Sequence, residues 1–156
     1  MSTAADTTAV TNLIAQYAEL VDAGDFAGVG ALFADGEFIG GGSSIRGSAN
    51  VERMFQGMVI RYEDGTPRTH HVTTNIAVEF DDPATTATAR AYFTVFQALP
   101  DLPLQAIVTG RYRDRFQCLD GQWRFAERRV TMHLTGDLSR HLRMPNAATR
   151  ENHGAG

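Results

Sequence analysis

The residues with the clearest capacity for chemistry are an aspartate, a tyrosine and two adjacent histidines. Asp22 lies near the end of the first predicted helix, Tyr17 precedes it by five positions, and His70 and His71 follow much later. A carboxylate that binds a histidine fixes its tautomer and supports it as a general base, and the usual histidine pKa of about 6.5 suits proton abstraction near neutral pH. A tyrosine hydroxyl can donate a hydrogen bond or a proton to a leaving oxygen. This set of residues indicates proton-transfer chemistry.

The aspartate and the tyrosine also have ordinary structural interpretations. An aspartate before a glycine at a helix end is commonly a solvated turn residue, and a tyrosine on an apolar stripe is commonly part of the core. Five residues of helix turn two side chains about 140° apart. Tyr17 and Asp22 therefore share a face only if the helix unwinds at Asp22, which Gly24 would allow.

The two histidines cannot both enter one pocket from a regular strand, because neighbouring side chains point to opposite faces. Strand alternation groups His70 with the apolar residues Val72, Ile76 and Val78, whereas His71 falls on the other face. The pattern alone favours His70, unless the strand contains a bulge that changes the alternation.

The first part of the chain has the periodicity of helices. A first helix that ends near Gly24 is predicted, because apolar residues recur there at spacings of three and four. These residues are Val10, Leu13, Ile14, Tyr17, Ala18 and Val21. Asp25 is placed to cap a shorter second helix, and Ser48 to cap a third over residues 49–61. A short strand is expected at residues 37–39.

The second part has the texture of long strands. Residues 69–80, 85–98, 104–119 and 122–134 alternate or are rich in Thr, Tyr and Phe, and Asp120-Gly121 is a strong hairpin turn. Helices followed by a meander of strands predict an α+β fold, a curved sheet on N-terminal helices that encloses a pocket. We expect one domain over residues 1–135 and a tail over 136–156, with a short helix around 138–142 or disorder.

Composition narrows the classes of function. The chain has 156 residues, a formal net charge of −4 and one cysteine, Cys118. The acidic balance is unlike that of a nucleic-acid binder, and one thiol forms no disulfide and no Cys-rich zinc site. Without a signal sequence or a long apolar run, we expect a cytoplasmic protein with no membrane partner. The histidine spacing and the lone Gly40-Gly41-Gly42 run predict neither a metal nor a phosphate-binding cofactor.

Five segments in the expected order, spread over residues 8–133, resemble SnoaL-like proteins of the nuclear transport factor two-like superfamily. They are Tyr17-Ala-Glu-Leu-Val-Asp22-Ala-Gly-Asp25 with Ala31-Leu32-Phe33, His70-His71-Val-Thr-Thr-Asn75, Ala87-Thr-Ala-Arg-Ala-Tyr92, Gly110-Arg-Tyr-Arg-Asp-Arg115 and Gly121-Gln-Trp-Arg-Phe125. The resemblance implies a cone-shaped domain. It does not choose among dehydratases, dehydrochlorinases, isomerases, cyclases, dioxygenase small subunits and binding domains.

The resemblance also implies roles for particular residues. Dehydratase and dehydrochlorinase members carry a catalytic aspartate near the end of the first helix and a histidine four residues before an asparagine, here Asn75, which selects His71 over His70. Dehydratase relatives also have a tyrosine five residues before the aspartate, which matches Tyr17. We add three kinds of substrate-binding candidate. Arg128 could stabilise an oxyanion, and His133 could lie at the pocket mouth. The remaining candidates form an apolar wall: Phe33, Met54, Met58 and Phe96.

These residues predict a cofactor-independent lyase or isomerase that acts on a small hydrophobic cyclic molecule. A non-catalytic binding or accessory domain is the alternative, and it predicts that His71 makes no contact with Asp22. A structural subunit of a dioxygenase is a third hypothesis, and it requires a large partner chain. From the resemblance we also expect a homodimer or homotrimer.

Overall fold

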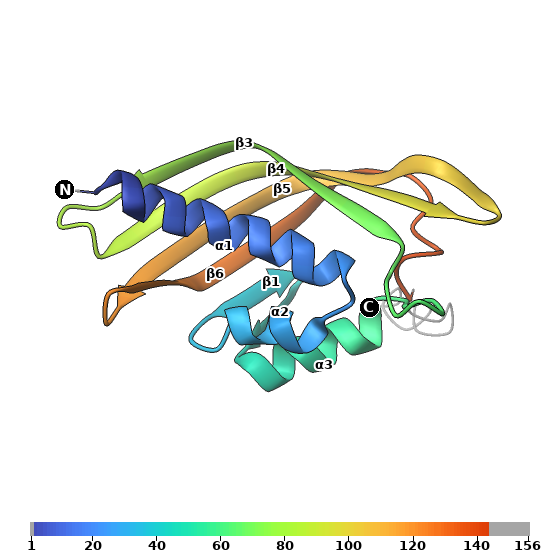
Figure 1. The fold of residues 1–156 in the computed structure, drawn as a ribbon, viewed down its shortest axis with the longest axis horizontal. Helices are drawn as coiled ribbons and strands as arrows, with labels where there is room; N and C mark the ends of the chain where they lie inside the picture. Colours follow the sequence, from blue (N-terminus) through green and yellow to red (C-terminus); the bar gives the residue numbers. More distant parts are fainter. Residues whose placement is uncertain (1, 144–156) are drawn as a thin grey trace, which may run out of the picture.

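In the computed structural model, which describes residues 2–143, three helices lie against one face of a six-stranded sheet (Figure 1). The helices are α1 (Ala4–Asp22), α2 (Phe26–Leu32) and α3 (Ser48–Met58). The strands are β1 (Glu37–Gly40), β2 (Ser43–Arg46), β3 (Thr69–Phe80), β4 (Thr86–Leu99), β5 (Leu102–Leu119) and β6 (Gln122–Thr135). The predicted α+β class is confirmed.

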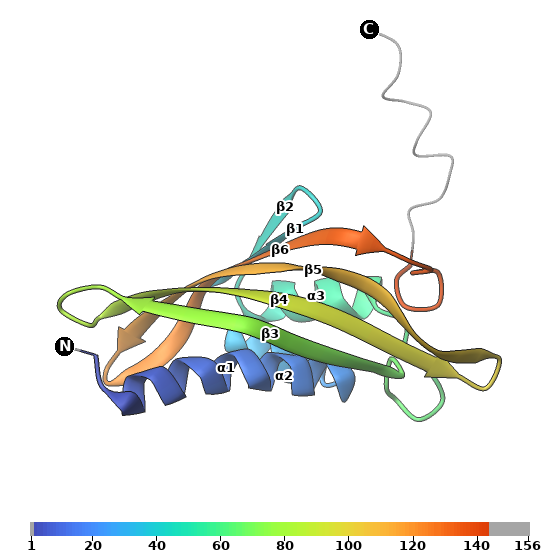
Figure 2. The same ribbon diagram turned by 90° about the horizontal axis from the view of Figure 1, so that it is seen from above.

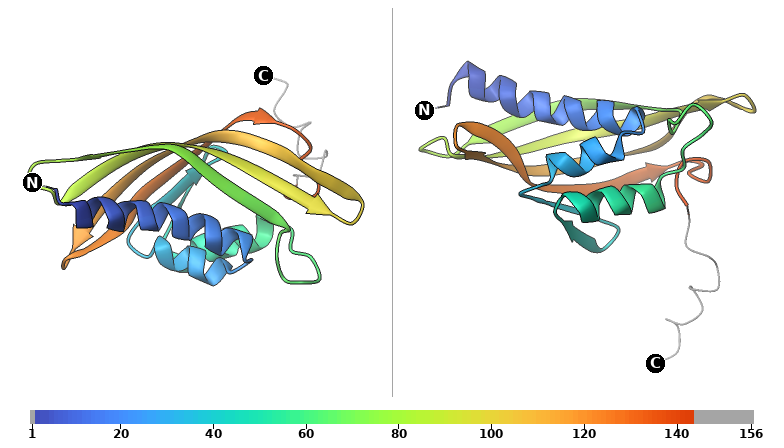
Figure 3. Two further views of the ribbon diagram at one scale, coloured as in Figure 1. Left: turned by 45° about the horizontal axis from the view of Figure 1, so that its top comes forward. Right: turned by 60° about the horizontal axis from the view of Figure 1, so that its bottom comes forward.

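The sheet is mixed and strongly curved. Its strand order is β2-β1-β6-β5-β4-β3, and every neighbouring pair is antiparallel except β1 with β6. Figures 2 and 3 show the four long strands bending over α1, with α2 and α3 on the same side of the sheet. The sheet and the helices therefore enclose the interior between them.

The helix ends follow from local hydrogen bonding. Thr3 caps α1 in a reciprocal capping box with Asp6, and the Asp25 side chain accepts from the backbone N–H of Gly28 as predicted for α2. The predicted cap of α3 is wrong. Gly47 occupies that position with a φ of 86°, and Ser48 is already the first helical residue. A positive φ suits glycine, so the backbone at this position selects Gly47 rather than a side-chain cap.

The core lies between the helices and the concave face of the sheet. Along β4 the buried inward residues alternate with exposed or half-buried ones, and the buried set includes a glutamine: Ala87, Ala89, Ala91, Phe93, Val95 and Gln97. The buried residues of α1 lie opposite: Val10, Ile14, Tyr17 and Val21. Within the described residues, no helix has the length and the apolar character that crossing a membrane requires.

A bulge in β3 breaks the predicted alternation. The register against β4 shifts between Thr74 and Ala77, and Asn75 has a φ of 56°. Val72 and Ile76 are 36% and 40% exposed, whereas Val78 packs against the core. The prediction that Val72, Ile76 and Val78 share one buried face is therefore wrong, because one extra residue reverses the facing of the strand.

After β6 the chain turns back toward the end of α3 (Figure 2), and we call residues 136–143 the C-terminal strap. In place of the predicted short helix, residues 138–142 form one turn, in which the N–H of Leu142 donates to the carbonyl of Leu138. Two backbone hydrogen bonds fasten the strap to the end of α3 and the residues after it: Ile60 N–H donates to the His141 carbonyl at 2.9 Å, and Arg143 N–H to the Met58 carbonyl at 2.8 Å. Residues 144–156 of the predicted tail lie outside the described residues.

Candidate active site

A cavity of about 560 Å³ lies between the inner faces of α1 and α3, the concave side of the sheet and the strap. Its walls are mostly apolar and include Val21, Phe38, Met54, Phe55, Met58, Val59, Phe93, Val95, Val108, Val130 and Leu142. The phenol and imidazole groups among its lining residues are Tyr17, His71, Tyr112 and His141. This size and composition are those of a small-molecule site.

Asp22 and His71 are hydrogen-bonded in the structure. The His71 Nδ1 lies 2.6 Å from Asp22 Oδ1, and the backbone N–H of His71 donates to Asp22 Oδ2 at 2.7 Å. An ionised carboxylate only accepts, so Nδ1 carries the proton and Nε2 is the basic nitrogen. The imidazole is 7% exposed and lines the cavity. The bulge explains how β3 turns His71 inward although its sequence pattern favours His70.

The position of Asp22 at the last residue of α1 disfavours a negative charge, because it lies at the negative end of the helix dipole. Burial also acts to raise the pKa of Asp22. The hydrogen bonds and charge of His71, together with the Thr69 hydroxyl that donates at 2.8 Å, outweigh burial and lower the pKa below its usual value. Asp22 is therefore ionised at neutral pH.

Tyr17 and Asp22 lie on different sides of α1. The helix continues through Asp22, and Ala23 at its C-cap is still close to helical geometry, so the chain does not unwind there. Tyr17 lines the cavity, whereas Asp22 lies in a groove between α1 and β3. Of the pair, only His71 borders both spaces, so Asp22 acts on the cavity through His71. Burial raises the pKa of Tyr17 to about 12, which keeps its hydroxyl protonated as a donor.

Arg128 is completely buried and is not part of a solvated charge run. Its Nε and Nη2 both donate to Asp114 at 2.8 Å, and both side chains are fully buried. The guanidinium carbon lies over two aromatic rings, 4.4 Å from the Tyr17 centroid and 3.8 Å from the Tyr112 centroid. Arg128 is not among the residues that line the cavity. It supports Tyr17 and Tyr112 from behind.

The predicted apolar wall is partly wrong. Met54 and Met58 line the cavity, but Phe33 is a core residue that stacks on Phe125 at 5.0 Å. Phe96 lies on the outer face of β4, where it pairs with His70, because the inward positions of that strand belong to Phe93, Val95 and Gln97. His133 is exposed on β6 and does not border the cavity.

Sequence reasoning missed Tyr112 and His141. Tyr112 shares the inward parity of β5 with Gly110, Asp114 and Phe116, so alternation could have found it. His141 gives a weaker signal. It lies between Leu138 and Leu142 in a segment without strand or helix periodicity, and only the fold of the strap places it at the cavity.

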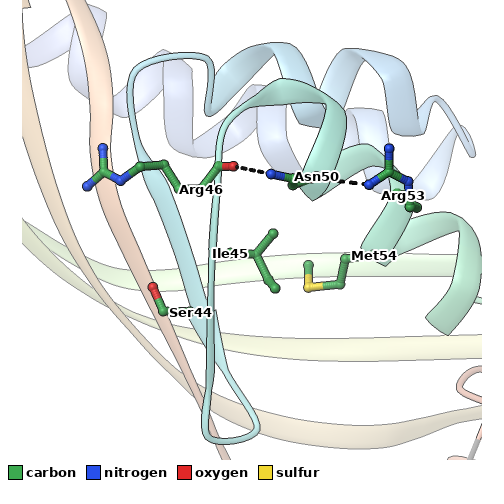
Figure 4. Close-up of a pocket in the computed structure, with 6 residues that line it drawn as sticks. All are labelled: Ser44, Ile45, Arg46, Asn50, Arg53 and Met54. Carbon is green, nitrogen blue, oxygen red and sulfur yellow. Dashed lines mark hydrogen bonds between the residues drawn. The ribbon is translucent and has the colours of Figure 1, made fainter.

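A second hollow of about 350 Å³ lies on the other side of Met54, between β2 and α3 (Figure 4). Ile45 faces Met54 there, and Asn50 links the Arg46 carbonyl to Arg53 through hydrogen bonds of 3.0 and 3.1 Å. This hollow is open to solvent and holds no acid–base pair. Within residues 2–143, no three His, Cys, Asp or Glu side chains are grouped as metal ligands would be.

The sequence matches a family model described as the SnoaL-like domain over residues 2–129. The chain belongs to the SnoaL-like family. No curated protein matches it significantly. The fold agrees with the SnoaL-like assignment, because one of the solved structures similar to this chain is described as an NTF2-like protein with a cystatin-like fold.

Three solved structures illustrate the range of this SnoaL-like fold. Rv3472 from Mycobacterium tuberculosis, a protein of unknown function, is 27% identical, with a TM-score of 0.68 over 83% of this chain and 72% of that one. A protein from Novosphingobium aromaticivorans provisionally assigned as a scytalone dehydratase is 23% identical, with a TM-score of 0.69 over 85% and 87%. LinA is 20% identical, with a TM-score of 0.68 over 90% and 95%. The two lower identities show similarity of fold alone.

Proposed function

We propose that the protein is a cofactor-independent lyase or isomerase that removes a proton from a small hydrophobic cyclic substrate. The observation that carries the proposal is the 2.6 Å contact of His71 with Asp22 at the wall of a largely apolar cavity. His71 is the base, Asp22 holds its tautomer and charge, and Tyr17 is the donor to an oxygen of the substrate.

The residues support a balanced elimination. His71 Nε2 takes a proton from a carbon next to a carbonyl, and the electron pair forms a carbon–carbon double bond as the neighbouring carbon–oxygen bond breaks. The departing oxygen takes a proton from Tyr17 and leaves as water, and the proton on His71 then restores the Tyr17 hydroxyl. An isomerisation uses the same first step and returns the proton to a different carbon. The apolar walls strengthen the few polar interactions involved.

One fold relative fits this proposal, because it is provisionally assigned as a scytalone dehydratase. The alternative, a binding or accessory domain without catalysis, expects His71 to lie free of Asp22. The close contact between the two side chains therefore favours the enzyme.

The decisive experiment measures proton abstraction across a panel of small cyclic compounds. Cyclic ketones and cyclic β-hydroxyketones are incubated with the protein in D₂O. NMR follows the loss of the α-proton signal and the dehydration of the compound. We expect exchange or dehydration for at least one compound. His71→Gln and Asp22→Asn should each lower the rate by about 10²–10⁴-fold while the fold persists.

The matched control is His70→Gln, which changes the neighbouring imidazole on the outer face of β3 and should leave the rate unchanged. Wild-type rates in both the His71 and the Asp22 variants would rule out the mechanism. Binding of panel members without exchange or dehydration would favour the binding domain.

A further inference from the structure

His141 is a buried imidazole that the proposed reaction does not use. It is 5% exposed, lines the cavity and projects from the C-terminal strap. Its ring lies beside that of His71, with centroids 6.2 Å apart in an edge-to-face arrangement. A substrate atom within reach of His71 is therefore close to His141 as well.

The two imidazoles have different environments. His71 is bound to a carboxylate, whereas His141 Nδ1 is buried without a hydrogen-bond partner among residues 2–143. Burial, followed by the nearby charge of His71, lowers the pKa of His141 to about 4. At neutral pH His141 is consequently a neutral ring with one N–H donor and one acceptor nitrogen.

A purely structural role does not account for this ring. The strap is fastened by the His141 carbonyl, by the Arg140 carbonyl, which accepts from Gln97 at 3.1 Å, and by Arg143, which donates to the Val59 carbonyl at 3.0 Å. None of these bonds uses the imidazole. An apolar side chain would fill the position without the cost of about 1–3 kcal/mol for burying an unpaired polar atom.

We propose that His141 is a second polar contact of the substrate site, whose neutral imidazole donates a hydrogen bond to an oxygen of the molecule that His71 deprotonates. This inference rests on the proposed function in taking the cavity as the substrate site. It specifies the ligand further, as a cyclic molecule with a carbonyl or hydroxyl oxygen beside the carbon that loses its proton. A neutral N–H donor at that oxygen stabilises the negative charge that develops there.

The test compares two probes that differ in one oxygen, 1-tetralone and tetralin, by calorimetric titration. Wild-type protein should prefer the ketone. In His141→Phe, which keeps a flat ring of similar size, the ketone should bind about tenfold more weakly while tetralin binds as before, the loss expected for one hydrogen bond. His141→Gln keeps an N–H donor and should keep most of the preference.

The matched control is His133→Phe on the exposed part of β6, which should bind both probes as the wild type does. A His141→Phe variant that weakens both probes equally, or neither, overturns the proposal. So does an absence of preference for the ketone in the wild type, or a preference that only His71→Gln abolishes.

A second measurement uses the unaltered protein, in case His141→Phe does not fold. Imidazole ¹⁵N resonances of His141 should move on addition of 1-tetralone and stay in place with tetralin, and an unmoved resonance overturns the proposal. These readouts need no turnover. Failure of the exchange assay would contradict the proposed function and leave the probe preference intact, whereas loss of the preference alone would contradict only the role of His141.

Discussion

At the scale of the residue, the burial of Arg128 has the features that make a fully buried charge tolerable. Burial alone would lower the pKa of Arg128, but Asp114 outweighs this effect and raises it, so the guanidinium stays charged. The bidentate pair neutralises the charge, and the guanidinium lies over the Tyr17 and Tyr112 rings. Arg128 Nη1 has no partner within residues 2–143. The packing behind Tyr17 and Tyr112 therefore depends on both members of the ion pair, because removing only one of them leaves the other charge buried and unpaired.

Replacing Arg128 alone should be strongly destabilising. Arg128→Met leaves the Asp114 carboxylate buried and unpaired, which should lower the free energy of unfolding by about 3–5 kcal/mol. Urea denaturation monitored by circular dichroism measures this change. The double variant Arg128→Met, Asp114→Leu removes both charges and should recover most of the loss.

A surface pair provides the comparison. Arg124 and Asp35 are each about two-fifths exposed, and Arg124→Ala should cost less than about 1 kcal/mol. Equal effects of Arg128→Met and Arg124→Ala would show that the buried pair has no special role.

At the scale of the element, the two halves of β3 must direct side chains of different parity to the same face of the sheet, which a regular strand cannot do. Its first half must turn His71 toward Asp22, and its second half must turn Val78 and Phe80 toward the core. These residues differ in parity, and the bulge at Asn75 reconciles them. The left-handed backbone at this position suits asparagine better than a β-branched residue.

Asn75→Val should therefore strain the bulge. We expect a loss of about 1–2 kcal/mol in the free energy of unfolding, the usual cost of a left-handed conformation for a side chain with a branched β-carbon. Asn75→Gly should be close to neutral. Thr74→Val tests the neighbouring position, which has no positive φ, and should change stability by less than about 0.5 kcal/mol. Denaturant midpoints measure all three, and a neutral Asn75→Val would contradict the role of the backbone here.

The same elements show what the sequence could predict. Long periodic segments gave α1 and the four long strands to within a few residues, because burial of one face imposes the pattern. β2 was missed, since Ser43–Arg46 is short, mostly exposed and flanked by glycine. Strand alternation placed His71 on the wrong face because it cannot detect one extra residue. The apolar residues Phe33 and Met54 looked alike in sequence, since a core and a cavity wall need the same residue types.

At the scale of the whole molecule, the burial of His141 makes the free energy of unfolding depend on pH. His141 is neutral in the folded protein down to about pH 4, whereas an unfolded histidine takes up a proton near pH 6.5. Between these values the unfolded chain binds more protons, so stability is fully present above about pH 6.5 and is lost as the pH falls toward 4. His71 and Asp22 are the titratable groups that act on His141. The lowered pKa of Asp22 acts in a separate window, below about pH 4.

The free energy of unfolding should fall by roughly 2–4 kcal/mol between pH 6.5 and pH 4, following the shift in the pKa of His141. Denaturant unfolding at half-unit steps of pH measures this slope. His141→Gln should flatten it in this window, while His133→Gln should leave it unchanged. A wild-type slope that persists in His141→Gln would assign the effect to other groups.

The position of the strap near the end of the described residues affects the order in which the site forms during synthesis. Tyr62 and Arg140, which the strap joins, are 78 positions apart in the chain, and ribosomes deliver residues in order from the N-terminus. When β6 has just been translated, Asp22, His71 and Tyr17 have all been synthesised, but the segment that carries His141 has not. The acid–base pair can thus form during synthesis, and the enclosed site is completed only when its last contributor has been translated and has closed a long loop.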